Sequence, residues 1–362
     1  MAQVTGANTV VVESLMSASI ADCAAIATKL GMRPSAFMRS VLQAPSTIVS
    51  GLTQDKAEYY KSTLANIGLD VTLRNDPIKD EEIHLFDVSI YVQEMSQIYD
   101  ISLQLGVFLG IPVEQIVKML SSPSGVIIGE VSSSTIDVIT KKLASFSVDI
   151  VASNKSTSLY NIYIPKSSPL ILSQVEQATN RHFETFSVDG GGFIEGLDYE
   201  SAQKCWERLR TLPGIIVINQ DFLRWDINLC SIPRDEIDLA SFSQVTKIPL
   251  EFCEKVIANA PLIVCEAVRN DDVLKIVNEL SYLGLDITAD LLSFKHFVVR
   301  INDEIHTGRA AETLKTLIKD FKFTGHRLPY TLPAKFNHFN ARHMCAELSA
   351  NGVEAIMEVA NG

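Results

Sequence analysis

The feature that most constrains the fold is a stretch of about thirty residues that occurs twice in the chain. Residues 43–72 read QAPSTIVSGLTQDKAEYYKSTLANIGLDVT, and residues 259–288 read NAPLIVCEAVRNDDVLKIVNELSYLGLDIT. The two stretches align without a gap at an offset of 216 residues, with Ala-Pro, Gly-Leu-Asp and Thr in register. Such a match predicts that one structural unit is used more than once.

The spacing predicts further copies between these two. An offset of 216 is three periods of 72 residues. Residues 123–151 follow the same course with one extra residue, and residues 196–218 repeat the Gly-Leu, Ala and Leu positions. A fifth copy, from Pro329 to Ile356, aligns without a gap. The five predicted modules are residues 1–75, 82–153, 158–219, 221–290 and 293–360, of which the third and fifth are divergent.

The first copy indicates the order of elements within a module. Short stretches that are β-branched or alternate in polarity predict strands at 9–13, 47–52 and 69–73. Apolar residues at helical spacing predict helices at 21–30, from Pro34 or Ser35 up to Pro45, and at 54–67. Each module is therefore predicted to be β-α-α-β-α-β, with a three-stranded sheet covered by helices.

Helix boundaries in the first copy carry the expected signals. Ser19 and Thr53 precede two of the predicted helices and are suitable N-caps. Gly31 and Gly68 follow those helices, where a residue with positive φ is common. The connections between modules are short and are not rich in Gly and Ser. The fold class predicted is therefore α+β, as five tandem modules packed in a compact array.

Composition limits the classes of function. The chain has 362 residues, too many for one ordinary core, and 47% of them are hydrophobic, which suggests buried surface between modules or subunits. The net charge of −12 disfavours RNA and anionic membranes as partners, and we expect no DNA binding. Six scattered cysteines without a CxxC pair indicate reduced thiols. Without a signal sequence or a bilayer-length apolar run, we expect a cytoplasmic protein with no membrane insertion.

The first copy also resembles a known domain. Its order of elements, with Leu-Gly-Met-Arg at 30–33, Gln-Ala-Pro at 43–45, Ser-Gly-Leu-Thr at 50–53 and Gly-Leu-Asp at 68–70, resembles the C-terminal domain of the bacterial ribosomal stalk protein. Residues 222–288 are the second-best match, and the other copies are recognisable mainly through these two. The resemblance implies a bacterial docking module of the α+β class.

In the stalk family this domain recruits translational GTPases through a helical face with basic residues. The positions that match here are Arg33, in the turn before the second helix, and Arg39, within that helix. Pro112 and Pro249 stand at the turn position in two other copies. The chain also lacks the helical dimerisation segment and the hinge that join a stalk protein to the ribosome. The module is therefore expected to serve another docking role.

Two local patterns are candidates for sites of chemistry. The run Asp-Gly-Gly-Gly at 189–192 lacks the Lys of a phosphate loop and is read as a turn before a strand. His338 and His343 are five residues apart with no Glu between them, which is not the zinc spacing HExxH. No nucleophile motif is present in the sequence. We therefore predict no catalytic residue, no metal and no cofactor.

One basic segment near the C-terminus is a candidate docking surface. Lys315, Lys319 and Lys322 recur at helical spacing and are followed by Arg327. Phe321 and Phe323 are interleaved with them. A solvated helix face gives the same pattern; as a functional surface, it favours an acidic protein partner, because the acidic chain repels phosphate.

These observations predict a non-enzymatic interaction or scaffold subunit of a larger bacterial cytoplasmic assembly, such as the cytoplasmic side of a secretion, pilus or motility machine. Two alternatives stay open. One is a translation-linked adaptor that recruits a GTPase through Arg33 and Arg39. The other is an enzyme with an unrecognised site between modules.

Overall fold

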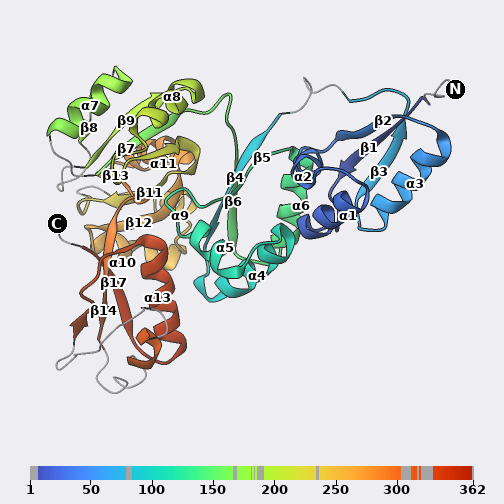
Figure 1. Cartoon of the computed structure of the whole chain (residues 1–362). Helices are drawn as coiled ribbons and strands as arrows, with labels where there is room; N and C mark the ends of the chain where they lie inside the picture. The colour runs from blue at the N-terminus through green and yellow to red at the C-terminus, as the bar shows by residue number, and fades with distance from the viewer. Residues whose placement is uncertain are drawn as a thin grey trace. The chain divides into compact units, whose positions relative to one another are not determined.

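The fold is known from a computed structural model of the whole chain (Figure 1). It describes residues 7–78, 84–165, 169–180, 182, 184–185, 191–233, 236–302, 311–315, 318 and 329–360. The chain divides into two compact units, Met1–Lys155 and Ser156–Gly362. We number the small sheets, each with its helices, as modules 1 to 5 in chain order; the limits set for the modules from the sequence stay a prediction.

The first unit holds modules 1 and 2, which share one topology. Module 1 consists of β1 (Asn8–Ser14), α1 (Ile20–Lys29), α2 (Pro34–Leu42), β2 (Ser46–Leu52), α3 (Gln54–Ala65) and β3 (Asp70–Arg74). Module 2 consists of β4 (Phe86–Val92), η2 (Met95–Gln97), α4 (Ile98–Leu109), α5 (Val113–Leu120), β5 (Val126–Val131), α6 (Ser133–Leu143) and β6 (Val148–Asn154). The first strand of each is central and antiparallel to both neighbours, in the orders β2-β1-β3 and β5-β4-β6.

The second unit begins with modules 3 and 4. Module 3 consists of β7 (Tyr160–Ile164), α7 (Pro169–Thr179), β8 (Glu184–Thr185), β9 (Gly192–Leu197), α8 (Tyr199–Leu209) and β10 (Ile216–Asn219). Module 4 consists of η3 (Gln220–Phe222), β11 (Arg224–Leu229), α9 (Leu239–Thr246), α10 (Leu250–Ala258), β12 (Leu262–Arg269), α11 (Asn270–Tyr282) and β13 (Ile287–Leu291). Their sheets have the orders β10-β7-β9-β8 and β12-β11-β13.

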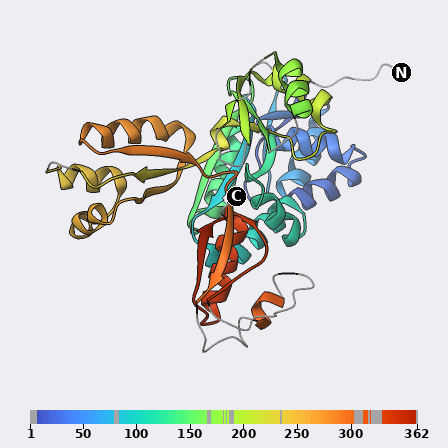
Figure 2. The ribbon, with the colours of Figure 1, turned by 90° about the vertical axis from the view of Figure 1, so that its left-hand side faces the viewer.

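Module 5 completes the second unit. Its elements are β14 (His296–Ile301), β15 (Tyr330–Thr331), β16 (Phe336–Asn337), α13 (His338–Ala350) and β17 (Ala355–Val359). Strand β14 pairs with β17 along its length and with β15 and β16 at successive positions. Helix α13 packs against β14 and β17 (Figure 2). In each of the five sheets that the described residues form, the first strand is thus an inner strand with a neighbour on both sides, which confirms the predicted α+β class of tandem modules.

The element order predicted for every module is correct for modules 1, 2 and 4 and is wrong in detail for the other two. In module 3, a two-residue strand, β8, adds a fourth strand to the sheet. In module 5, the second strand is split into β15 and β16. These are the two modules whose sequences diverge most. Parts of both modules lie outside the described residues.

Local sequence signals explain the helix boundaries of module 1. The Ser19 side chain accepts a hydrogen bond from the Asp22 amide at the start of α1. Gly31 and Gly68 have φ of +73° and +92°, the left-handed region predicted for them. Thr53 occupies the N-cap of α3 but makes no side-chain capping bond there, so its predicted role is only positional. Helix α3 ends at Ala65, two residues before the predicted end.

Modules 3 and 4 each have an apolar core of their own, and a further cluster joins neighbouring modules of the second unit. Phe193 and Ile218 of module 3 pack with Leu223, Leu291 and Phe294. The ring of Tyr163 also stacks on Phe294, with ring centroids 3.9 Å apart. Since aromatic side chains bury large areas, this cluster fixes module 3 against the chain that leads into module 5. The cluster is the interface that the high apolar content predicts.

The helices are short. Within the described part of the chain, no single helix is long and apolar enough to cross a bilayer. One pair, Met95–Leu109 with Val113–Leu120, reaches that length and hydropathy only when the two helices are taken together, and it is bent by 112° at its break.

Candidate interaction surfaces

The two arginines matched to the stalk family lie at opposite ends of α2. Arg33 is the N-cap residue of α2, and Arg39 is in its last turn. Both side chains are exposed. Arg39 is close enough to Glu130 of module 2 to help lower the pKa of that carboxyl group, after the larger effect of Lys155. Arg39 is therefore part of the electrostatic contact between modules 1 and 2.

The turn position that Arg33 occupies in module 1 recurs in modules 2 and 4. Pro112 and Pro249 are the N-cap residues of α5 and α10, just as Arg33 is the N-cap of α2. The alignment of these three positions from sequence is therefore structurally correct. Proline carries no charge. Of these three modules, module 1 is therefore the one with a basic residue at this turn.

The basic segment near the C-terminus is described only at its start. Lys315 is exposed. Lys319, Lys322 and Arg327 lie outside the described residues, and their predicted role stays a prediction.

Modules 1 and 2 are joined by a polar contact at the end of α2. The Leu42 carbonyl accepts hydrogen bonds from the Ser132 amide, at 3.0 Å, and from the Thr135 hydroxyl, at 2.8 Å. The Ala44 carbonyl accepts from the Ser134 hydroxyl at 2.8 Å. The last carbonyls of a helix have no partner within the helix. The start of α6 satisfies them here, so module 2 caps a helix of module 1.

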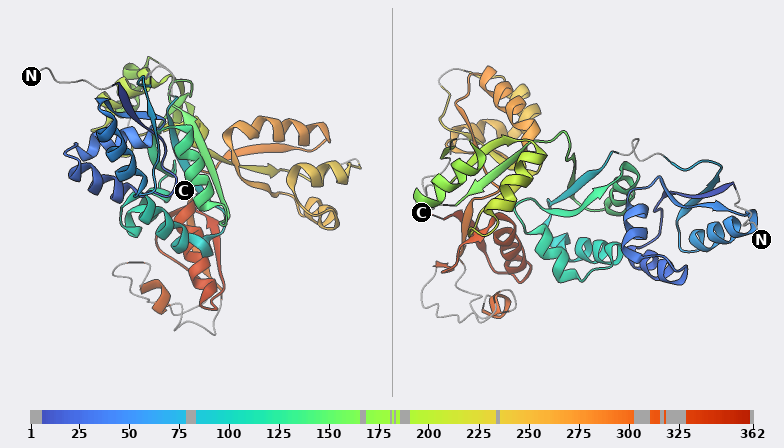
Figure 3. Two further views of the ribbon diagram at one scale, coloured as in Figure 1. Left: turned by 90° about the vertical axis from the view of Figure 1, so that its right-hand side faces the viewer. Right: turned by 45° about the horizontal axis from the view of Figure 1, so that its top comes forward.

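Close packing of α1 and α4 supports the same interface (Figure 3). Gly110, at the end of α4, has φ of +69°, and a Cβ atom placed on it lies 3.3 Å from Cβ of Ala21 in α1. A side chain at this position is therefore strained by the positive φ and requires Ala21 to give by a few tenths of an ångström. Glycine at 110 serves both the turn and the helix contact.

A bulge recurs at the same place in the second strand of four modules. Each bulge residue has positive φ: Gly51, Glu130, Gly196 and Ala267. Opposite the bulge, the central strand places one residue of each module: Thr9, Asp87, Asn161 and Asp226. In modules 2, 3 and 4 this side chain accepts a hydrogen bond from the amide of the bulge residue, at 3.1 to 3.2 Å. The bonds satisfy amides that the strand ladder leaves unpaired.

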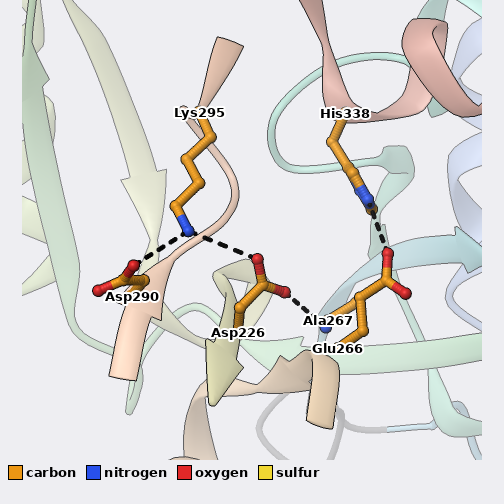
Figure 4. A network of polar contacts seen from close by, with 6 residues as sticks. All are labelled: Asp226, Glu266, Ala267, Asp290, Lys295 and His338. Atoms are coloured by element: carbon orange, nitrogen blue, oxygen red, sulfur yellow. Dashed lines mark hydrogen bonds and ion pairs between the residues drawn. The ribbon is translucent and has the colours of Figure 1, made fainter. Parts of the chain in front are cut away.

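In module 4 this bulge lies within a larger polar network (Figure 4). The Lys295 ammonium lies 3.5 Å from one oxygen of Asp226 and 3.3 Å from Asp290. His338 of module 5 contacts Glu266 of module 4, with 3.1 Å between Nε2 and Oε1. Figure 4 shows Lys295 between the two aspartates and the imidazole directed at Glu266. The network joins the bulge of module 4 to the start of α13.

Burial and hydrogen bonding shift the two central carboxyl groups in opposite directions. Desolvation by burial raises the pKa of Asp226, against smaller lowering effects of the Ala267 amide and Lys295. The hydrogen bond from His338 lowers the pKa of Glu266. Asp226 is thus a buried structural acceptor, while Glu266 is a half-exposed partner for the histidine.

Replacement of Glu266 by glutamine tests this contact between modules. A lowered pKa means that the carboxylate stabilises the fold above the ordinary glutamate pKa of about 4.3, and that this stability is lost as pH falls through the folded value. Because Glu266 is more than half exposed, we expect a loss of under about 1 kcal/mol at pH 7. Hydrogen exchange of α13 at pH 7 and pH 3 measures it. An equal effect at both pH values contradicts the assignment.

The histidine and cysteine side chains have structural surroundings. His338 is buried, contacts Glu266 and lies 5.4 Å from Phe297 between ring centroids. No group of three His, Cys, Asp or Glu side chains in the described ranges is placed to hold a metal ion. The six cysteines are free thiols. Burial raises the pKa of Cys23 to about 12 and that of Cys265 to about 11.

Module 3 contains an open apolar groove of about 390 Å³ that no sequence motif indicates. It lies between α8 and β10 and is lined by Tyr160, Tyr199, Ala202, Gln203, Trp206, Ile215, Ile216 and Val217. The sequence signal for this groove is a difference between the module copies. Tyr199 and Trp206 of α8 stand where module 1 has Gln54 and Lys61 in α3.

Comparisons with known proteins give no relative from which a role can be transferred. Neither protein-family models, nor curated proteins, nor solved structures match the chain. The resemblance to the stalk domain therefore stays a resemblance of sequence pattern.

Proposed function

We propose that the chain is a non-enzymatic interaction protein, a scaffold subunit within a larger bacterial cytoplasmic assembly. The observation that carries the proposal is the use of small α+β modules in series, with neighbouring modules inside each of the two units joined by specific contacts. Serial modules that bind each other through defined surfaces present several further surfaces to other proteins in a fixed order.

Within each unit, the contacts between neighbouring modules support a fixed arrangement of the modules. In the first unit, Ser132 and Thr135 cap the end of α2. In the second unit, the contact between His338 and Glu266 and the stacking of Tyr163 on Phe294 join neighbouring modules. Polar contacts of this kind fix the register between packed elements more than they add stability.

Several exposed apolar side chains fit a role in docking. Helix α4 exposes Tyr99, Leu103 and Val107, spaced four residues apart on one face. Module 4 exposes Leu274 and Tyr282 on α11. Clustered apolar side chains at a surface are typical of protein contacts.

Affinity purification of the tagged full chain, after cross-linking in the cells that produce it, tests the proposal. We expect one or more proteins to be recovered at a constant ratio to the chain. The control is the chain with Tyr99→Lys and Val107→Lys, which alters an exposed face and leaves the cores intact. Recovery of the tagged chain alone, from both the parent and the variant, contradicts the proposal.

A further inference from the structure

The end of α10 in module 4 has the same structure as the end of α2 in module 1. At the offset of 216 residues, α10 (Leu250–Ala258) and α2 (Pro34–Leu42) coincide in their first and last residues. The cap residues that follow, Asn259 and Gln43, have matching φ of −102° and −99°. Both caps are followed by Ala-Pro. The two helix ends therefore present equivalent carbonyl groups.

In module 1 this helix end is occupied by the start of α6 from module 2. The carbonyls of Leu42 and Ala44 accept hydrogen bonds from the N-cap and first turn of α6. The Gln43 side chain donates to the Glu130 carbonyl, just before α6, at 3.2 Å, and Arg39 helps lower the pKa of the Glu130 carboxyl group. The negative end of one helix dipole thus faces the positive end of another.

Module 4 retains the side chains that serve this contact. Asn259 stands where module 1 has Gln43, so a side-chain amide follows both helices. Lys255 stands where module 1 has Arg39, so a cation is in the last turn of both. The cation also favours the end of its own helix. The amide and the cation together repeat the set of groups that contacts module 2 in the first unit.

The helix end of module 4 is nevertheless open. Ala258 is exposed and Ala260 is half-buried, whereas Ala44 is fully buried at the matching place in module 1. Within the described part of the chain, no group donates a hydrogen bond to the carbonyl of Ala258 or of Ala260. Module 5 does not fill the site as module 2 does, because the start of its helix α13 lies elsewhere, where His338 contacts Glu266.

We propose that the end of α10 binds the start of a helix from a partner protein, in the way that the end of α2 binds the start of α6. The helix that fits has Ser or Thr at its N-cap and in its first turn, and an acidic residue two positions before the N-cap. Its hydroxyl groups donate to carbonyls that α10 leaves without a partner in the helix. Its acidic side chain faces Lys255.

A partner is favoured over a second copy of the chain, because the α6 of every copy is already bound to its own module 1. The inference rests on the proposed function, since it names the chemistry of one partner. The experiment that tests it uses a synthetic peptide and no cellular partner. Its failure therefore leaves the affinity purification of the full chain as a separate test.

The probe is a helical peptide with the sequence of residues 130–144, EVSSSTIDVITKKLA. A lactam between Asp137 and Lys141, which are four residues apart and exposed on α6, holds the peptide helical. The matched control is the same lactam peptide with alanine at the three hydroxyl positions Ser132, Ser134 and Thr135.

The receptor is the full chain with its alanine methyl groups labelled with ¹³C, so that Ala260 reports on the site by NMR. The protein variant is Ala258→Lys. A cation at this exposed position favours the end of α10 but repels the positive start of a docking helix. An unchanged methyl signal of the buried Ala267 shows that module 4 is folded in the variant.

We expect a saturable shift of the Ala260 signal as the peptide is raised to about 1 mM, the weak end of specific recognition. We expect at least fivefold weaker binding of the alanine peptide, which lacks the hydroxyl donors, and by Ala258→Lys. Absence of a saturable shift overturns the proposal. Equal binding of the alanine peptide overturns recognition through hydroxyl groups.

Two further outcomes place the contact elsewhere. A shift of Ala44 in place of Ala260 shows that the peptide displaces α6 from module 1, and it overturns the assignment to module 4. A shift of Ala260 when the concentration of the chain alone is raised makes a second copy the occupant and overturns the assignment to a partner.

Discussion

Replacement of Gly68 by alanine is expected to lower the free energy of unfolding of module 1 by roughly 2–4 kcal/mol. Gly68 has φ of +92°, which costs a residue with a side chain. The added Cβ atom also overlaps the Ser17 hydroxyl oxygen and lies 3.0 Å from the Ala18 amide nitrogen. The Ser17 amide donates to the Gly68 carbonyl at 3.2 Å, so the two segments cannot separate without losing this bond.

Module 4 supplies the matched control. Gly284 is the counterpart of Gly68 at the offset of 216 and has φ of +80°, but a Cβ atom placed there meets nothing within 4 Å. Gly284→Ala is therefore expected to cost only the backbone term, about 1–2 kcal/mol. Because a chain of several modules need not unfold in two states, hydrogen exchange at β3 and β13 is the suitable measurement. Equal loss of protection in the two variants contradicts the role given to Ser17.

Two substitutions of Asp226 are expected to distinguish the contribution of its hydrogen bond to stability from that of its charge. Asp226→Ala leaves the buried Ala267 amide without its acceptor and is expected to cost roughly 1–3 kcal/mol. Asp226→Asn keeps an acceptor for that amide and removes a buried charge, so we expect it to stay within about 1 kcal/mol of the parent. Module 3 has asparagine, Asn161, at the same place opposite its bulge. Hydrogen exchange of β11 and β12 measures both variants.

The pH dependence gives this prediction a definite sign. The pKa of Asp226 is raised in the folded state, so its contribution to stability is present below the ordinary aspartate pKa of about 3.9 and is lost as pH rises through the folded value. The Asn variant does not titrate here. It should therefore gain stability relative to the parent as pH rises. A relative loss with rising pH shows that the ion pair with Lys295 outweighs desolvation.

The repeated fold was predictable from sequence because its signals are local. Gly68 and Ser19 perform their tasks within a few residues of a helix end, so the spacing of such residues reveals the element order. Modules 3 and 5 were predicted less well. Short strands such as β8 and β15 have only two residues, too few to show a periodicity.

The surfaces were not predictable because their members lie far apart in the chain. Arg39 and Glu130 are in different modules, and neither residue type signals that they meet. The residues opposite the four bulges are Thr, Asp, Asn and Asp in successive modules, so a search for identical residues misses them. The groove beside Trp206 was not predictable because the groove is formed only when the fold places β10 next to α8.

Native mass spectrometry of the untagged chain, released gently from the cells that produce it, tests the interaction function most directly. The chain alone has a mass of 39.9 kDa. If it is a scaffold subunit, most of it will be found at higher mass, in species that dissociate to the chain and a fixed set of other proteins. Recovery of the chain entirely at 39.9 kDa, under conditions that preserve other assemblies from the same cells, contradicts that function.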